Sequence, residues 1–428
     1  MLIHVVRPGD TLFSIAAQYG VSPVLLSGLN GLHNEAALLV GQALLVRSPR
    51  LVHTVAPGDT LYSIARQYGV SELTLYRNNY PLLGRPVLRT GEELVIAYED
   101  DAGLGRIGVN GYAYPFIDES LLSAAAPYLS YLTPFTYGIA QDGRLLPLAD
   151  EELLAAAARY RVAPLMHLST LTEAGNFSNE RSSLLLNDPA LQEALIRDVI
   201  DTMQRKNYYG LDVDFEFVFP AERTLYADFI RTLRERLNPL GYPVTVALAP
   251  KTRADQPGLL YEAHDYALLG AAANAVLLMT YEWGYTFGPP MAVAPLDQVR
   301  AVLNYAVSEI APEKIFLGIP LYGYDWPLPY RQGETRAQSL SPQRALELAR
   351  EHRAEIRYDE QAQTPYFYYT ARSGQEHVVW FEDVRSMDAK LRLIAQYGLQ
   401  GAGYWNLMRD MPQNWTLLHA LYEIETLQ

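Results

Sequence analysis

Three acidic residues alternate with apolar residues in segment 211–217, which runs Leu-Asp-Val-Asp-Phe-Glu-Phe. Because successive side chains of a β-strand point to opposite faces, a strand here would place Asp212, Asp214 and Glu216 in one row. Neighbouring carboxyls in such a row lie roughly 7 Å apart, and at an effective dielectric constant of about 20 they repel by about 2.4 kcal/mol. This repulsion predicts that one carboxyl stays protonated near neutral pH beside an ionised one. Cleavage of a glycosidic bond uses such a pair.

Two other interpretations of the acidic row stay open. The row could be the solvated face of an edge strand, although the flanking apolar residues argue against this. It could also bind magnesium or calcium, since carboxylate oxygens are the ligands that these ions prefer. No histidine-rich ligand set accompanies the acids in the sequence.

The elements around this row predict a (β/α)8 TIM barrel. Amphipathic helices are expected between most of the strands, for example over 188–206, 221–237 and 295–309. Eight strand-helix units in about 320 residues fit the barrel, and a doubly wound sheet is the alternative. The expected strands are 107–113, 131–137, 163–168, 210–217, 244–249, 275–280, 315–319 and 401–405.

One long segment, about 325–385, interrupts the alternation after the seventh strand. Residues 365–370 and 376–381 are rich in aromatic and β-branched residues, and a Ser-Gly turn separates them. This pattern predicts a hairpin within a small α+β insertion. On the C-terminal face of the barrel, the insertion would add a wall to the cleft.

The chain opens with an internal repeat. Residues 4–12 recur at 53–61, an offset of 49, and the similarity continues through the next helical pattern. Each repeat is expected to fold as β-α-α-β, with Asp10 as a helix N-cap, Gly20 at the helix end and a closing strand over 43–46. The expected domains are repeats 1–48 and 49–98, a linker over 99–105 that serves as a hinge, and the barrel over 106–428.

Composition excludes several classes of function. The net charge of −14 disfavours nucleic acids and anionic membranes as partners. The chain has no cysteine, which excludes thiol catalysis, disulfides and cysteine-ligated zinc. No apolar run approaches 18 residues, so no transmembrane helix is expected. The first residues predict a strand and a turn, so no signal peptide is expected.

The acidic segment resembles the active-site strand of glycoside hydrolase family 18, whose pattern is D-G-x-D-x-D-x-E. Gly210 and the three acids match, and Tyr209 stands where the family has its first Asp. The resemblance, which covers about residues 106–428, implies that Glu216 is the proton donor. It also implies that Asp214 orients the acetamido group of the substrate and that Asp212 supports Asp214.

Two further segments match the same family. Residues 278–282 resemble its M-x-Y-D segment, so Tyr281 is expected to contact the acetamido carbonyl, and Glu282 stands in place of Asp. Residues 403–406 resemble the eighth strand, whose tryptophan, here Trp405, forms the floor beneath the scissile sugar. Trp405 could instead only pack in the hydrophobic core. Tyr112 is a further candidate wall residue.

The repeats resemble LysM modules over roughly residues 2–97, on the Pro-Gly-Asp-Thr-Leu segment and the helix after it. This resemblance implies binding of N-acetylglucosamine polymers, meaning peptidoglycan or chitin. Asp10 and Asp59 could alternatively serve only to cap and turn the chain. The expected sugar-binding residues are Gly9, Asp10, Thr11 and Leu12, with Gly58, Asp59, Thr60 and Leu61.

Together the resemblances imply an N-acetylglucosaminidase that uses a substrate-assisted retaining mechanism and needs no metal or organic cofactor. Two LysM modules before a family 18 barrel resemble spore cortex-lytic enzymes, so the expected substrate is spore cortex peptidoglycan. The protein is expected to be a monomer, made in the cytoplasm and deposited in the coat or cortex layers of the spore. A chitinase, a non-catalytic lectin and an adhesive wall protein are the alternatives.

Overall fold

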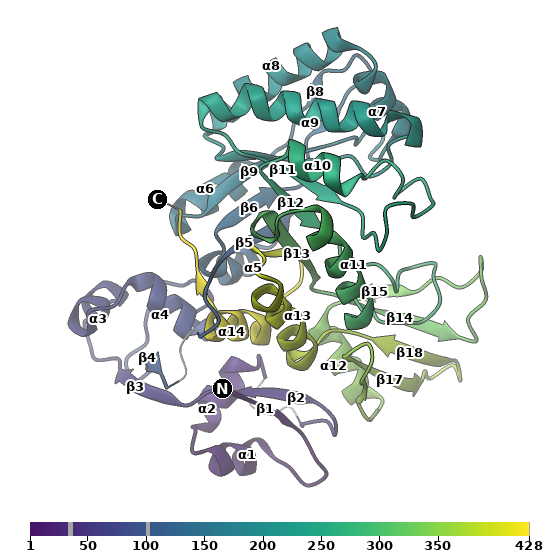
Figure 1. Cartoon of the computed structure of the whole chain (residues 1–428). Coiled ribbons are helices and arrows are strands. Elements are labelled where there is room, and N and C mark those ends of the chain that lie inside the picture. Colours follow the sequence, from purple (N-terminus) through teal and green to yellow (C-terminus); the bar gives the residue numbers. More distant parts are fainter. Residues whose placement is uncertain (33–36, 100–102, 428) are drawn as a thin grey trace.

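The computed structural model describes residues 1–32, 37–99 and 103–427. Residues 100–102 of the predicted linker lie outside the described residues. Two small β-α-α-β units lie beneath a large barrel in Figure 1, and an antiparallel sheet lies at the right of the barrel.

Eight parallel strands form the barrel, and pairing of β19 with β5 closes it. This closed order confirms the predicted TIM barrel, and the doubly wound alternative is wrong. A short strand, β20 (Glu423–Ile424), pairs in parallel with the first two residues of β5. The barrel strands are β5 (Arg106–Ala113), β6 (Tyr131–Pro134), β9 (Ala163–Ser169), β10 (Gly210–Asp214), β11 (Val244–Leu248), β12 (Ala275–Leu278), β13 (Ile315–Pro320) and β19 (Gly401–Trp405).

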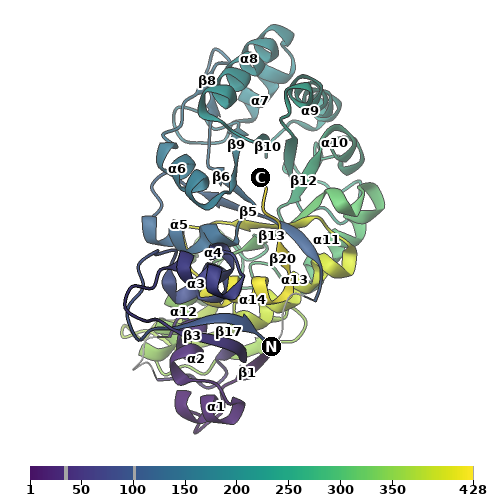
Figure 2. The ribbon, with the colours of Figure 1, turned by 90° about the vertical axis from the view of Figure 1, so that its left-hand side faces the viewer.

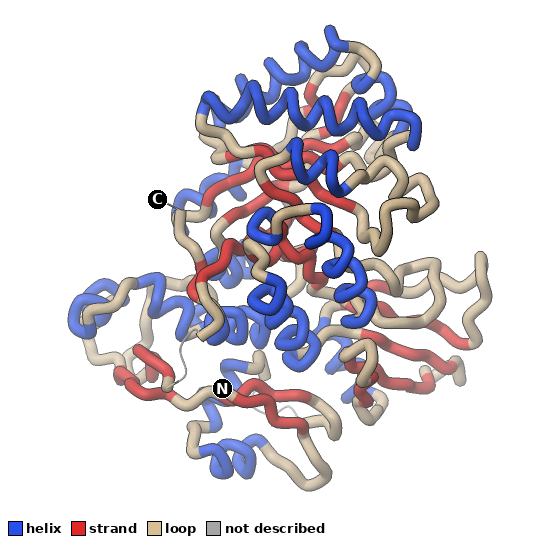
Figure 3. Tube along the Cα trace, viewed as in Figure 1, coloured by secondary structure: helices blue, strands red, loops and turns tan. Residues whose placement is uncertain are grey.

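Helices cover the outside of the barrel, as the blue tubes around the red strands in Figure 3 show. In α8 the residues Leu195, Val199 and Met203 recur on one face and are fully buried. Asp188 caps the helix by accepting from the backbone N–H groups of residues 190 and 191. The helices are α5 (Glu119–Ala125), α6 (Glu151–Tyr160), α7 (Asn179–Leu186), α8 (Pro189–Lys206), α9 (Arg223–Leu237), α10 (Tyr266–Ala272), α11 (Leu296–Glu309), α13 (Val384–Tyr397) and α14 (Pro412–Leu421).

The insertion after the seventh barrel strand is a five-stranded antiparallel sheet with one helix. Its central hairpin pairs β17 with β18, as the aromatic pattern predicted. Phe367, Val379 and Phe381 of this region form a separate small core with α12. The elements are β14 (Gly323–Leu328), β15 (Gln338–Leu340), α12 (Pro342–Glu351), β16 (Arg357–Asp359), β17 (Thr364–Thr370) and β18 (Glu376–Trp380).

Short elements complete the chain. The strands β7 (Gly138–Ile139) and β8 (Leu145–Leu146) form a two-residue ladder. Single 3-10 turns lie at Tyr80–Leu82, Ala126–Tyr128, Pro220–Glu222, Asn238–Leu240 and Pro312–Lys314. Among the described residues no single helix is long and apolar enough to cross a bilayer. By length and composition alone, the helices α1 (Leu12–Tyr19) and α2 (Pro23–Leu29), bent by 105° at the break between them, pass that test as a pair.

Each repeat folds as β-α-α-β. Gly20 ends the first helix in the left-handed conformation, as predicted. The predicted N-cap is wrong, because Thr11 and not Asp10 caps α1, in a reciprocal capping box with Ser14. The elements are β1 (Leu2–Val5), α1 (Leu12–Tyr19), α2 (Pro23–Leu29) and β2 (Ala43–Val46), then β3 (Pro49–Thr54), α3 (Leu61–Tyr68), α4 (Glu72–Asn78) and β4 (Glu93–Tyr98).

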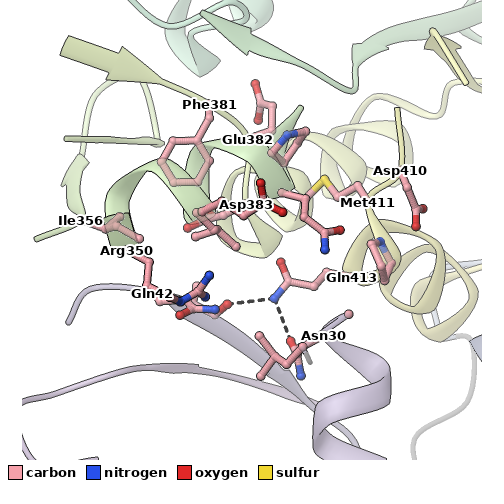
Figure 4. A pocket seen from close by; sticks show the side chains of 18 residues that line it. Asn30, Gln42, Arg350, Ile356, Phe381, Glu382, Asp383, Asp410, Met411 and Gln413 are labelled. Atoms are coloured by element: carbon pink, nitrogen blue, oxygen red, sulfur yellow. Dashed lines mark hydrogen bonds between the residues drawn. The ribbon is translucent and has the colours of Figure 1, made fainter. Parts of the chain in front are cut away.

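The first repeat is packed against the barrel (Figures 1 and 2). This packing differs from the expectation that the linker serves as a hinge. Gln413 donates from its amide to Asn30 Oδ1 at 2.7 Å, as Figure 4 shows, and to the Ala43 carbonyl at 2.9 Å. The backbone N–H of Ile356, in the insertion, donates to the Val40 carbonyl at 3.0 Å. A small cavity of about 60 Å³ remains at this junction.

The second repeat is held in the same way by other parts of the barrel. Arg77 is buried and donates to the Pro127 carbonyl at 2.7 Å, while Tyr128 donates from its hydroxyl to the Arg77 carbonyl at 3.0 Å. Tyr80 of this repeat and Leu45 of the first both belong to the main hydrophobic core of the barrel. The three units therefore share buried surface.

The glycines Gly41 and Gly91 offer a matched test of this packing. They occupy equivalent turns, with φ of 84° and 86°. A Cβ at Gly41 would lie 1.8 Å from the Ile356 carbonyl oxygen, whereas a Cβ at Gly91 meets nothing within 4 Å. Both Gly→Ala variants carry the strain of a positive φ, about 1 kcal/mol or more. We expect Gly41→Ala to lose about 1–3 kcal/mol more than Gly91→Ala, because its neighbour must move.

Thermal unfolding and limited proteolysis of the two variants measure this difference. Gly41→Ala should unfold at the lower temperature and should release the first repeat to protease sooner. Equal losses in both variants would contradict a stabilising contact between this repeat and the insertion.

Candidate active site

Strand β10 places the acidic row inside the barrel. Leu211, Val213 and Phe215 are fully buried on the outer face, where the Phe215 ring stacks on Tyr226 of α9 at 5.6 Å. Asp212 faces the interior and is also fully buried. The strand ends at Asp214 and not at 217 as predicted, so Glu216 follows the C-terminal end of the strand. In a TIM barrel this end carries the functional groups.

A pocket of about 210 Å³ opens at this end of the barrel. Asp212 does not line the pocket but lies below it, where its carboxylate accepts from the Tyr112 hydroxyl at 2.8 Å. The other predicted residues of the barrel site come together here. The lining comprises Tyr112, His167, Asp214, Glu216, Ala247, Pro250, Leu260, Tyr261, Leu277, Met279, Tyr281, Glu282, Trp283 and Trp405.

Tyr281 and Glu282 follow the end of β12 and line the pocket. Glu282 has a positive φ of 67°, and its carboxylate accepts hydrogen bonds from two tyrosine hydroxyls. Tyr322 makes one, and Tyr324 of β14 makes the other at 3.1 Å. Sequence reasoning missed both tyrosines. The sequence feature that could have indicated them is the Tyr-Gly-Tyr segment at 322–324, just after the seventh barrel strand.

Trp405 is packed among aromatic rings on one wall. Its ring centre lies 5.8 Å from Tyr112, 4.9 Å from Phe135 and 6.1 Å from Tyr114. Tyr114 in turn stacks on Phe116, whose side chain is exposed. Such a cluster of aromatic rings suits contact with the apolar face of a sugar ring. Phe135 was missed because its segment shows only a generic apolar pattern.

Burial dominates the electrostatics of the acids. It raises the pKa of Asp212 to about 6, against the lowering effect of the Tyr112 hydrogen bond. Burial also raises the pKa of Asp214, and the charges of Glu216 and Asp212 add to this effect. For Glu216, burial and then the charge of Glu282 raise the pKa to about 7. Mutual repulsion, the cause expected from the sequence, is therefore the smaller contribution.

A carboxyl with a pKa near 7 holds a proton in about half of the molecules at neutral pH and can therefore donate it. The deeper Asp212 carboxyl, with a pKa of about 6, is ionised in a larger share of the molecules at neutral pH. Within residues 1–32, 37–99 and 103–427, no three His, Asp or Glu side chains are grouped so as to hold a metal ion. The arrangement fits acid-base chemistry on a substrate that enters the pocket.

The residues predicted to bind sugar in the repeats shape the turn before each first helix. The Asp10 carboxylate accepts from the backbone N–H of Arg7 at 2.7 Å and lies 3.0 Å from His4 Nε2, and these bonds lower its pKa. Asp59 makes the equivalent contacts with Ala56 and His53. These contacts suit the interpretation that both acids turn the chain.

The exposed side chains beside these turns are aromatic. Phe13 and Tyr62 are 71% and 58% exposed and lie 49 residues apart, at equivalent positions of α1 and α3. Leu12 and Leu61, which precede them, pack into the core of each repeat. Sequence reasoning missed the two rings because its candidate sugar contacts ended with the turn residues 9–12 and 58–61, directly before them.

Comparison with known proteins finds matches to two families of domains. The family described as Glycosyl hydrolases family 18 matches residues 166–410, and the LysM domain matches residues 4–47 and 53–97. The "Cortical fragment-lytic enzyme" of Bacillus subtilis (strain 168) is 39% identical over 430 residues, 99% of each chain. The Bacillus cereus spore cortex-lytic enzyme SleL has a crystal structure that matches with a TM-score of 0.84 at 36% identity, over 99% of this chain and 98% of that one. A chitinase from Chromobacterium violaceum ATCC 12472 matches at 0.68 and 26% identity, over 73% and 98%.

The charge of Glu282 can be removed without changing its shape much. In Glu282→Gln the pKa of Glu216 should fall below about 7, because a neighbouring negative charge no longer opposes its ionisation. Carbon-13 NMR titration of the Glu216 carboxyl measures this value directly. Glu222→Gln, in a buried glutamate outside the pocket, is the control. An unchanged Glu216 pKa in Glu282→Gln would contradict the electrostatic coupling.

Proposed function

This chain belongs to glycosyl hydrolases family 18, and we propose that it hydrolyses β-1,4 glycosidic bonds in the N-acetylglucosamine-containing glycan of spore cortex peptidoglycan. The observation that carries the proposal is the Glu216 carboxyl, held in the pocket with a pKa of about 7 beside Asp214 and Tyr281. A proton donor of this kind matches the chemistry of glycosidic cleavage at neutral pH.

The proposed mechanism uses the acetamido group of the substrate itself. Glu216 gives its proton to the glycosidic oxygen as the bond from this oxygen to the anomeric carbon breaks, and the acetamido oxygen attacks that carbon. Asp214 accepts a hydrogen bond from the acetamido N–H, and Tyr281 donates one to its oxygen. The ionised Glu216 then takes a proton from water, and this water opens the oxazolinium ring. The configuration of the sugar is therefore retained.

The remaining site residues have supporting roles in this proposal. The Tyr112 hydroxyl holds the Asp212 carboxylate below Asp214, and the charge on Asp212 raises the pKa of Asp214. Trp405 offers its ring as the floor of the pocket. Glu282, which also lines the pocket, contacts a sugar hydroxyl in this proposal.

The choice of cortex peptidoglycan rests on the relatives. Two proteins that match this chain over nearly their whole length are named a cortical fragment-lytic enzyme and a spore cortex-lytic enzyme. We therefore propose that the protein is made in the cytoplasm, is deposited in the coat or cortex layers of the spore and acts as a monomer. Chitin is the competing substrate, and parallel assays on the two glycans separate them.

The proposed acid is tested by Glu216→Gln, which keeps the size of the side chain and removes the transferable proton. We expect turnover on a soluble N-acetylglucosamine oligomer and on cortex peptidoglycan to fall by about 100-fold or more, because general acid catalysis is lost. Mass spectrometry of the released reducing ends measures it. Glu222→Gln, outside the pocket, should keep its turnover.

The same assay tests the nucleophile. An oligomer whose acetamido groups are replaced by hydroxyls should not be cleaved. Equal cleavage of both oligomers would contradict the substrate-assisted mechanism, and turnover above about a tenth of wild type in Glu216→Gln would contradict its role as the acid.

For the repeats, we propose that the Phe13 and Tyr62 rings add stacking contacts to the glycan bound by the turn residues 9–12 and 58–61. Replacing both rings by alanine should weaken retention on insoluble peptidoglycan by roughly tenfold, since one stacked ring contributes about 0.5–1.5 kcal/mol. Hydrolysis of a soluble oligomer should stay unchanged. Leu240→Ala, an exposed apolar residue of the barrel, is the control. Undiminished retention of the double variant would reject a role for the rings.

A further inference from the structure

One buried histidine in the pocket has no role in the mechanism above. His167 lies on β9, directly opposite Asp212 in the parallel register with β10, and is 1% exposed. Its ring packs edge-on against Tyr112, with ring centres 5.7 Å apart, and is tilted against Phe135, with ring centres 4.8 Å apart. The imidazole is thus fixed at the level of the buried carboxyls.

The Nδ1 side of this imidazole has a clear hydrogen-bond partner. Nδ1 lies 2.6 Å from the Thr136 hydroxyl oxygen, the shortest of the contacts of that hydroxyl. Burial lowers the pKa of His167 to about 3, so the ring is neutral near pH 7 and carries one proton. If Thr136 donates to Nδ1 along this short contact, the proton of the ring is on Nε2.

The Nε2 side faces the acids. Nε2 lies 3.7 Å from Oδ2 of Asp212 and also 3.7 Å from Oδ2 of Asp214. Among the described residues, Nε2 and the Oδ1 atoms of both aspartates are buried polar atoms without a hydrogen-bond partner. Buried polar groups are costly when unpaired, so a small rotation of either carboxyl toward Nε2 would be favourable. The equal distances leave both rotations open.

We propose that His167 is a positioning residue for the aspartate pair, which donates a hydrogen bond from Nε2–H to whichever of Asp212 and Asp214 is ionised. The proposal rests on the function proposed above, in which Asp214 must turn its carboxylate toward the acetamido group. The Nε2–H donor stabilises the ionised pair without adding a charge. Its proton stays on the ring throughout the reaction.

The proposal makes the acid limb of the pH profile depend on His167. The titratable groups around the ring are Asp212 and Asp214 of β10, Tyr112 of β5, and Glu216 and Tyr281 in the same pocket. Loss of a donor to a carboxylate raises the pKa of that carboxyl. The acid limb of kcat/KM should then move to higher pH, because the free enzyme must ionise the pair.

Two variants of similar size separate hydrogen bonding from packing. His167→Leu fills the site without a donor, and His167→Gln supplies a neutral N–H donor. The matched control is His264→Gln, because His264 is equally buried but its ring nitrogens hydrogen-bond to the backbone, at Ala249 and Phe215, and its ring packs against Tyr226. All proteins are assayed as the full chain on a soluble N-acetylglucosamine oligomer, with melting temperatures recorded in parallel.

We expect the acid limb to move up by about one pH unit or more in His167→Leu, and to stay near that of wild type in His167→Gln and His264→Gln. An unmoved limb in His167→Leu, or an equal shift in His167→Leu and His167→Gln, would overturn the proposal. A lower melting temperature of the His167 variants with no shift in the acid limb of their pH profiles would also overturn it, because this result indicates a purely structural residue.

A second measurement does not depend on activity. Nitrogen-15 NMR of the imidazole signals, assigned by their loss in His167→Gln, reports which ring nitrogen carries the proton. A neutral Nε2–H ring between pH 5 and 8 is expected, and a proton on Nδ1 would overturn the proposal. Failure of wild type to cleave the oligomer would instead reject the proposed function, which keeps the two outcomes distinct.

Discussion

The active site depends on burying a row of carboxyls inside the barrel. Removing a carboxylate from water costs several kcal/mol unless hydrogen bonds or a bound proton compensate. In this chain the compensation comes from tyrosine hydroxyls, with Tyr112 on Asp212 and with Tyr322 and Tyr324 on Glu282. A hydroxyl stabilises a neighbouring carboxylate without the full charge of an arginine or lysine. A cation in the same place would lower the pKa of Glu216 and would leave it ionised at neutral pH.

The architecture and most of the site follow from patterns within short segments. All eight barrel strands were predicted because parallel strands buried on both faces are apolar runs. The acids of β10 were found by alternation. His167 was missed because a single histidine in an apolar strand usually belongs to the core. Its role depends on the strand register that sets it opposite Asp212. The pairing of strands that lie far apart in the chain cannot be predicted from either segment alone.

The position of the repeats shows the same limit. In the sequence Gly41 and Gly91 are equivalent, and in the structure they adopt nearly the same φ. Only Gly41 abuts the Ile356 carbonyl, a contact between residues more than 300 positions apart. Likewise Thr11, and not the predicted Asp10, caps the helix, because the Asp10 carboxylate is engaged by His4 and by the backbone N–H of Arg7. Local propensity predicts that a helix starts there, whereas these contacts decide which residue caps it.

The seam between the first repeat and the insertion has a consequence for the evolution of such chains. Binding modules on flexible tethers can be exchanged between proteins with little penalty, because few contacts cross the boundary. Here the backbone bond from Ile356 to Val40 and the amide of Gln413 cross it. The insertion, which the Ile356 bond reaches, also carries Tyr324, whose hydroxyl donates to Glu282 of the pocket. A recombination event that replaced this repeat would leave unmatched buried surface, so repeat and barrel should be inherited as one unit and diverge together.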